Sequence, residues 1–175
     1  YTGVRYLEPN PEDIHTCLDD KFVSAQMMIT SEDGMSFDNM NDKTTVIDPI
    51  EDKQIGCMTH TRDPKVWRGK EAWYMVIGSR MPQNEGKLLF YRSSDLKNWE
   101  YVNSASKKGL GWMWECPDYF EVNGKKVLVF SPMGISDKEY CNLSVCTTVE
   151  FDEQTCTMNI PDEYQMLDYG KDLYA

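Results

Sequence analysis

The chain has 175 residues, a net charge of −11 at neutral pH and a mean hydropathy of −0.58. A chain of this length can bury a substantial core, and the composition is ordinary for a globular protein. A groove for nucleic-acid phosphates needs clustered Lys and Arg, and a membrane helix needs roughly 18 consecutive apolar residues. The sequence shows neither feature, so we expect no nucleic-acid partner and no membrane partner.

The cysteines and histidines offer no metal-ligand pattern. No C-x-x-C motif occurs, the spacing of the cysteines is irregular, and the two histidines are far apart. We therefore expect reduced thiols in a cytoplasmic protein, with no metal site and no cofactor. The residues concerned are Cys17, Cys57, Cys116, Cys141, Cys146, Cys156, His15 and His60.

Short apolar segments separated by turns predict an all-β chain. Sustained helical periodicity is absent, and prolines recur too often for long helices. Residues 8–20 are polar and contain two prolines, which predicts a loop. Strands are predicted at residues 1–7, 21–30, 72–78, 87–92 and 126–130.

Two elements of the sequence occur twice. Ser31–Phe37 has a serine, an aspartate two residues later and an aromatic residue four further on, and Ser93–Trp99 repeats this form 62 residues later. Arg62-Asp63-Pro64 aligns with Glu115-Cys116-Pro117 without a gap. A repeat of about 50 to 60 residues with four short strands per unit predicts a β-propeller, with a β-sandwich as the alternative.

The chain holds about two full units of this repeat. Residues 167–175 read as the opening strand of another blade, and the first residue lies inside a blade. We therefore expect residues 1–175 to form a single partial β-propeller catalytic domain cut from a larger protein. Because unpaired blade faces invite association, self-association or association with the rest of the parent chain is also expected.

Each copy of the second repeat delivers a carboxylate near the start of a strand. Asp63 and Glu115 are predicted to lie on the innermost strands of adjacent blades, within about 12 Å of each other, which suits acid/base chemistry on a polar substrate. The apolar neighbours of Glu115 favour its protonated form, whereas Arg62 beside Asp63 favours an ionised carboxylate.

The remaining aromatic and polar candidates favour structural roles. Core packing is expected for Trp67, Trp73 and Trp99, whereas Trp112 and Trp114 could either pack or stack on a sugar. Cys116 is predicted to pack beneath the acid, and His60 to be a structural residue.

Five segments in order resemble glycoside hydrolase family 32, and most closely its bacterial sucrose-6-phosphate hydrolases and invertases. The resemblance covers nearly the whole chain and implies part of a five-bladed β-propeller that cleaves terminal β-fructofuranosyl bonds with retention. The C-terminal β-sandwich of that family is absent. The segments are His60–Trp67, Tyr74–Gly78, Leu89–Trp99, Trp112–Asp118 and Asp168–Ala175.

The resemblance also implies roles for individual residues. Glu115 would be the general acid/base, Asp63 the transition-state stabiliser that binds fructosyl hydroxyls, and Arg62 a further residue of the substrate pocket. The family's nucleophile belongs to a Trp-Met-Asn-Asp-Pro-type motif that does not occur in this sequence, so the 175 residues alone are expected to be inactive. The substrate would be sucrose, sucrose 6-phosphate or a short fructan.

Two further functions stay open at this point. One is a non-catalytic carbohydrate-binding or structural propeller fragment, and the other is a related furanosidase that acts on arabinan. The Glu-Cys-Pro-Asp form of residues 115–118 makes the arabinan reading the weaker of the two.

Overall fold

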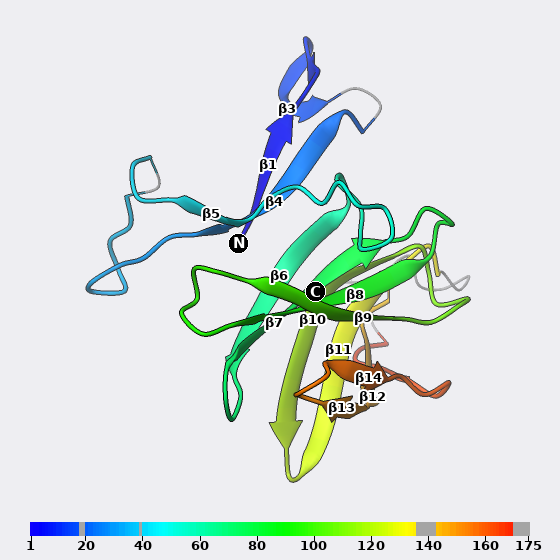
Figure 1. Cartoon of the computed structure of the whole chain (residues 1–175). Helices are drawn as coiled ribbons and strands as arrows, with labels where there is room; N and C mark the ends of the chain where they lie inside the picture. The colour runs from blue at the N-terminus through cyan, green and yellow to red at the C-terminus, as the bar shows by residue number, and fades with distance from the viewer. Residues whose placement is uncertain (18–19, 39, 136–142, 170–175) are drawn as a thin grey trace.

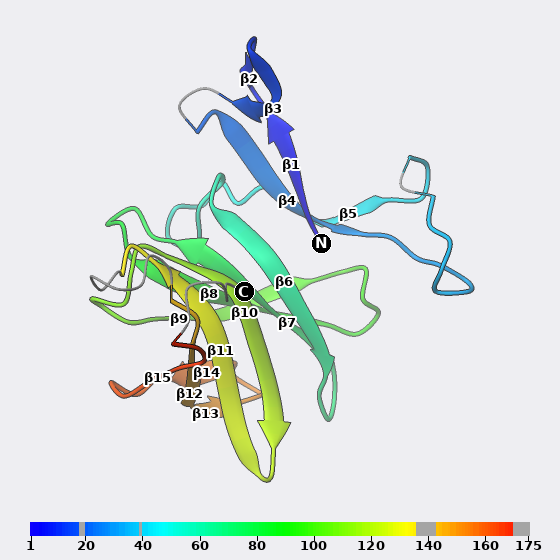
Figure 2. The ribbon, with the colours of Figure 1, turned by 180° about the vertical axis from the view of Figure 1, so that it is seen from behind.

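The described part of the chain is built from antiparallel β-strands that form successive sheets (Figures 1 and 2). The computed structural model describes residues 1–17, 20–38, 40–135 and 143–169. No helix occurs within these ranges, so none of their segments is a helix that could cross a membrane.

Three sheets follow one another along the chain. The first, in the order β1-β4-β5, comprises β1 (Thr2–Tyr6), β4 (Phe22–Met28) and β5 (Thr44–Ile47). The second is a simple meander of β6 (Thr61–Arg68), β7 (Trp73–Arg80), β8 (Gly86–Ser93) and β9 (Glu100–Ser106). The third, in the order β10-β11-β12-β15, comprises β10 (Met113–Val122), β11 (Lys125–Met133), β12 (Val145–Thr148) and β15 (Gln165–Met166).

Two small hairpins are inserted into this arrangement. They are β2 (Pro9–Asn10) with β3 (Asp13–Cys17), and β13 (Glu150–Asp152) with β14 (Thr157–Asn159). The β2–β3 hairpin projects beyond the first sheet, away from the other two (Figure 1). The prediction of a loop over residues 8–20 is wrong, since this segment contains the β2–β3 hairpin. Pro9 is tolerated there because β2 is an edge strand and has no further strand on its outer side.

The other predicted strands are confirmed as β1, β4, β7, β8 and β11. The strand predicted at residues 167–175 lies mostly outside the described residues, which stop at 169.

The central strands of the second sheet are buried on both faces because alternate side chains point into two different cores. One face packs against the third sheet and the other packs toward the first, which explains the unbroken apolar runs of β7 and β8. Fully burying a side chain of this size stabilises the fold by about 1.5–3 kcal/mol. The first core includes Tyr74, Val76, Leu88, Phe90, Trp114, Tyr119, Leu128 and Phe130. The second includes Met75, Ile77, Leu89 and Tyr91.

The predicted repeat of Ser-x-Asp turns is confirmed in its hydrogen bonds. The Asp33 carboxylate accepts backbone N–H groups from residues 35 and 36, and Asp95 accepts those of residues 97 and 98. Ser31 and Ser93 each accept the N–H three residues later. These hydrogen bonds, chiefly from the backbone, hold the pKa of both carboxyls well below its usual range.

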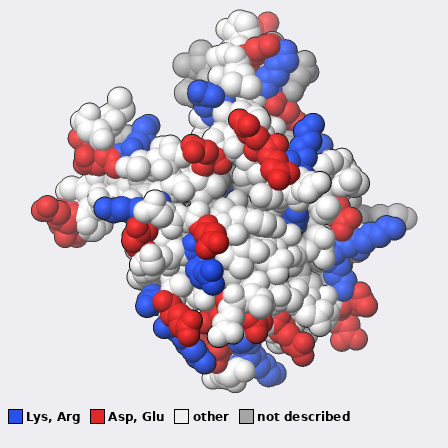
Figure 3. Space-filling view, viewed as in Figure 1, with Lys and Arg blue, Asp and Glu red and all other residues white. Residues whose placement is uncertain are grey.

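On the face seen in Figure 3 the lysines and arginines lie in small groups scattered among acidic and uncharged residues. This distribution supplies no continuous basic track for a nucleic-acid backbone on that face.

Candidate active site

The two aligned segments adopt the same backbone in the structure. The β6–β7 pairing is interrupted by a bulge between Arg62 and Lys65, and the β10–β11 pairing is interrupted between Glu115 and Asp118. Both bulges contain a proline, whose missing N–H is tolerated where the ladder is broken. The sequence repeat is therefore a repeated β-bulge.

Each bulge holds one residue in the left-handed region. Asp63 has φ of 63° and the equivalent Cys116 has φ of 47°. Such a conformation costs a residue with a side chain about 1–2 kcal/mol, and it persists where the surroundings hold it in place. The two strained residues contact each other, because the Cys116 N–H donates to Asp63 Oδ2 over 3.0 Å.

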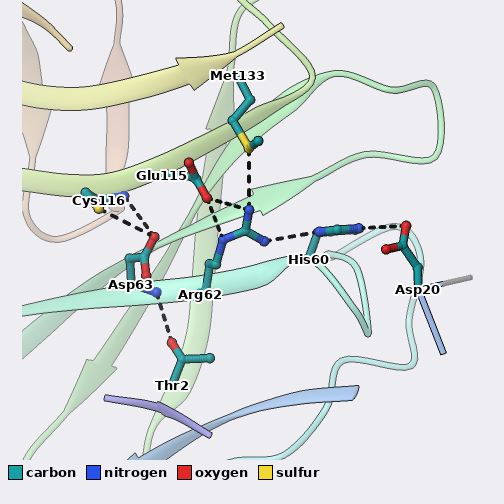
Figure 4. Close-up of polar contacts among 8 residues, drawn as sticks. All are labelled: Thr2, Asp20, His60, Arg62, Asp63, Glu115, Cys116 and Met133. Carbon is teal, nitrogen blue, oxygen red and sulfur yellow. Dashed lines mark hydrogen bonds and ion pairs between the residues drawn. The ribbon is translucent and has the colours of Figure 1, made fainter. Parts of the chain in front are cut away.

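Strands β6 and β10 lie side by side in the same direction, so equivalent residues meet. Arg62 contacts Glu115, Asp63 contacts Cys116 and Lys65 contacts Asp118, and each pair is separated by 53 residues in the sequence. Lys65 Nζ lies 3.1 Å from Asp118 Oδ2. Arg62, Asp63 and Glu115 are thus brought into one site (Figure 4).

Arg62 forms an ion pair with Glu115. Its Nη2 and Nε donate to Oε1 over 2.6 Å and 2.9 Å, and Nη2 also lies 3.5 Å from the sulfur of Met133. The side chains of Arg62 and Glu115 are 24% and 15% exposed, so solvent screens this contact only in part.

This contact corrects the predicted charge environment. Arg62 was expected to act on its neighbour Asp63, but its guanidinium lies on Glu115 of the adjacent strand. Successive side chains of a strand point to opposite faces, so chain neighbours are seldom partners. Of the predicted apolar neighbours of Glu115, Met113 and Trp114 are fully buried, and Trp114 packs in the core on the opposite face of β10.

A partly buried polar network supports Asp63 from the first sheet. The Asp63 N–H donates to Thr2 Oγ1 over 3.0 Å, and the Thr2 hydroxyl donates to Gln26 Oε1 over 2.9 Å. Gln26 Nε2 in turn donates to the carbonyl of Thr61 over 3.1 Å, and Gln26 is only 2% exposed. Sequence reasoning missed Thr2 and Gln26; the one available signal was a lone glutamine in the apolar strand β4.

Cys116 does not have the properties of a nucleophile. Partial desolvation of its thiol, followed by the nearby carboxylates of Asp63 and Glu115, raises the pKa of Cys116 to about 11 although the residue as a whole is exposed. The thiolate is the reactive form, and it is scarce at neutral pH. The structure therefore gives Cys116 no covalent role. The prediction that Cys116 packs beneath the acid is wrong, because the residue is exposed and contacts the Asp63 carboxylate.

Trp112 and Trp114, whose roles the sequence left undecided, differ in their surroundings. Trp114 is fully buried, packs on Phe130 and donates its indole N–H to the carbonyl of Leu110, so it is a core residue. Trp112 is partly exposed, with its ring edge-on to His60 and beneath the Arg80 guanidinium.

The expected packing roles of Trp67 and Trp99 are matched by the structure. Trp67 packs against the core between the second and third sheets, and Trp99 against the core toward the first. Trp73 contacts the guanidinium of Arg68 instead.

This geometry offers two carboxylates at one end of adjacent strands, with a cation on one of them. One carboxyl group can exchange a proton with a ligand and the other can accept hydrogen bonds from its hydroxyl groups. Such a pair suits cleavage of a glycosidic bond, where a leaving oxygen needs a proton and a cationic ring needs stabilisation.

Comparisons with known proteins agree with this chemistry. A sequence profile of the glycosyl hydrolases family 32 N-terminal domain matches residues 8–175. The sucrose-6-phosphate hydrolase of Escherichia coli is 39% identical over 124 residues, which are 70% of this chain and 24% of that protein. The raffinose invertase of Escherichia coli is 35% identical over 171 residues, which are 92% of this chain and 34% of that protein.

A solved structure gives the same result. The family 32 β-fructofuranosidase of Bombyx mori, also solved in complex with sucrose as a mutant, superposes with a TM-score of 0.80 at 33% identity. The match covers 100% of this chain and 36% of that one. The present chain spans about a quarter to a third of the length of these curated relatives. The predicted fold class is confirmed as part of a five-bladed β-propeller, and the chain belongs to glycoside hydrolase family 32.

Proposed function

We propose that the protein to which this chain belongs hydrolyses terminal β-fructofuranosyl bonds with retention of configuration. Residues 1–175 are part of one catalytic propeller domain in this proposal. The substrates are sucrose, sucrose 6-phosphate or short fructans, in keeping with the names of the relatives. The observation that carries the proposal is the meeting of Glu115, Arg62 and Asp63 across two adjacent strands.

Glu115 is the general acid/base in this proposal. It donates a proton to the glycosidic oxygen as the bond to the fructosyl ring breaks, and it later takes a proton from the water that releases fructose. Arg62 holds the carboxyl group in place through its two contacts with Oε1. A retaining mechanism also requires a carboxylate nucleophile, and we assign none within residues 1–175. The nearby Asp118 is not assigned this role because its carboxylate accepts a hydrogen bond from Lys65.

Asp63 is the transition-state stabiliser. Its carboxylate is fixed by the Cys116 N–H and its backbone by Thr2, so it can meet fructosyl hydroxyls without reorganising. In glycosidases, hydrogen bonds to the sugar that strengthen as its ring becomes cationic lower the activation barrier by roughly several kcal/mol.

The test is Glu115→Gln in the full-length protein, assayed on sucrose and on an aryl β-D-fructofuranoside whose leaving group needs no proton. We expect turnover of sucrose to fall about 100- to 10,000-fold, with formation of the fructosyl-enzyme from the aryl substrate largely spared. Glu121→Gln, an exposed position on the same strand, is the matched control and should behave as wild type. Equal losses on both substrates would refute the acid role.

A further inference from the structure

His60 directly precedes β6, and both of its ring nitrogens are in contact with polar side chains. Nδ1 is 3.1 Å from Arg62 Nη1, and Nε2 is 3.3 Å from Asp20 Oδ2 (Figure 4). The side chain is only 12% exposed. The ring is also held edge-on by Phe22 and Trp112, at centroid distances of 5.5 Å and 5.4 Å.

These contacts fix the tautomer of the imidazole. A guanidinium can only donate, so Nδ1 must be the accepting nitrogen with a free lone pair. In the neutral ring the proton is then on Nε2, where it donates to the Asp20 carboxylate. The four side chains form one directed series from Asp20 through His60 and Arg62 to Glu115.

We propose that His60, oriented by Asp20, is a positioning residue that holds the Arg62 guanidinium against the carboxyl group of Glu115. The inference rests on the proposed role of Glu115 as the acid/base. The Arg62 guanidinium contacts three partners, which are His60, Glu115 and Met133. The contact with His60 fixes the plane of the guanidinium, in which Nε and Nη2 donate to Oε1 of Glu115.

The charged groups around His60 favour this arrangement. They are Asp20 from the turn before β4, Arg62 on β6 and Arg80 on β7. Burial, with the two arginines as smaller contributions and Asp20 acting in the opposite direction, lowers the pKa of His60. The ring is therefore neutral at pH 7, as acceptance from Arg62 requires. Protonation would place an N–H against the guanidinium and break the series.

A purely structural role for His60 would not require a hydrogen-bond acceptor at Nδ1. Packing against Phe22 and Trp112 requires only a flat side chain, whereas orientation of Arg62 requires an acceptor at the position of Nδ1. The two roles therefore respond differently to conservative substitutions.

The experiment compares His60→Asn with His60→Gln in the full-length protein. Asparagine places its Oδ1 as many bonds from the backbone as Nδ1, so it can accept from Arg62. Glutamine places its polar atoms at the distance of Nε2 and leaves Arg62 without that acceptor. We expect kcat/KM on sucrose to fall about 10- to 100-fold for His60→Gln and by less than about threefold for His60→Asn.

The aryl fructoside supplies the second readout. Because its leaving group needs no proton, the loss in the bond-breaking step for His60→Gln should be much smaller than with sucrose. Equal activity of the two variants on sucrose, or equal losses on both substrates, would overturn the positioning role. If both variants unfold, Asp20→Ala decides: Asp20 is 68% exposed, and its removal should lower sucrose turnover several-fold but leave the melting temperature nearly unchanged. An unchanged turnover there would also overturn it.

Failure of this inference can be told apart from failure of the proposed function. If Glu115→Gln abolishes sucrose turnover but His60→Asn and His60→Gln have equal activity on sucrose, only the positioning role is wrong. If Glu115→Gln leaves sucrose turnover intact, the assignment of the acid is wrong, and the positioning role loses its basis.

Discussion

Gly78 is a point of very close approach between the second and third sheets. It pairs with Arg62 in the β6–β7 ladder, and a Cβ atom there would lie 1.8 Å from the carbonyl oxygen of Trp114. Real Cβ atoms essentially never approach another atom within 3.0 Å, so β7 and β10 would have to separate by about 1.2 Å. Because Trp114 precedes Glu115, this shift would reach the acid.

We expect Gly78→Ala to lower the free energy of unfolding by about 3 kcal/mol. That is the upper end of the usual cost of over-packing, because the obstructing atom belongs to the backbone and cannot rotate away. For a cooperative unit of 150–250 residues, this corresponds to a fall in Tm of about 6–12 °C.

Thermal unfolding followed by circular dichroism measures the effect, with Gly124→Ala as the control. Gly124 has φ of 73° and nothing within 4 Å of its added Cβ, so its substitution costs only the backbone strain, about 1–2 kcal/mol. If Gly78→Ala melts no lower than Gly124→Ala, the close contact between β7 and β10 is wrong.

Three further predictions concern the groups around the site. Gln26→Leu removes the buried acceptor of Thr2, so kcat/KM on sucrose should fall about 10-fold while Tm falls modestly; unchanged kinetics would contradict the support of Asp63. Cys116→Ser should keep near wild-type activity, and iodoacetamide at neutral pH should modify Cys116 slowly because its thiol pKa is about 11. Folding lowers the pKa of His60 below its usual value of 6.5, so the folded state favours the neutral ring. The free energy of unfolding that this preference contributes is present above that pH and is lost on acidification. His60→Asn should therefore lose less unfolding free energy than wild type between about pH 7 and pH 5.

The equivalence of the two aligned segments could be predicted from the sequence because the residues of each segment are contiguous, whereas the bulge itself was not predicted. Arg62-Asp63-Pro64 and Glu115-Cys116-Pro117 carry the same proline beside the same strand start, and the structure gives both the same break in pairing. The apolar runs of β7 and β8 were equally readable, since strands buried on both faces lose the polar alternation.

The partners of these residues could not be predicted in the same way. Thr2 lies 61 residues from Asp63, and Asp20 lies 40 residues from His60, and no local pattern links them. The contact of Arg62 with Glu115 instead of Asp63 depends on the side-by-side placement of two strands, which is a property of tertiary packing. The β2–β3 hairpin was missed because prolines weighed more in the prediction than the β-branched residues of β3.

The most direct test of the central claim is azide rescue of Glu115→Ala in the full-length protein, with the aryl β-D-fructofuranoside as substrate. The fructosyl-enzyme should still form, because the leaving group needs no proton, but it should accumulate because no base activates water. Azide needs no deprotonation, so it should attack the intermediate directly, accelerate turnover and yield a fructosyl azide of retained β configuration. A rate that does not respond to azide, with fructose as the sole product, would contradict the role of Glu115 as the acid/base.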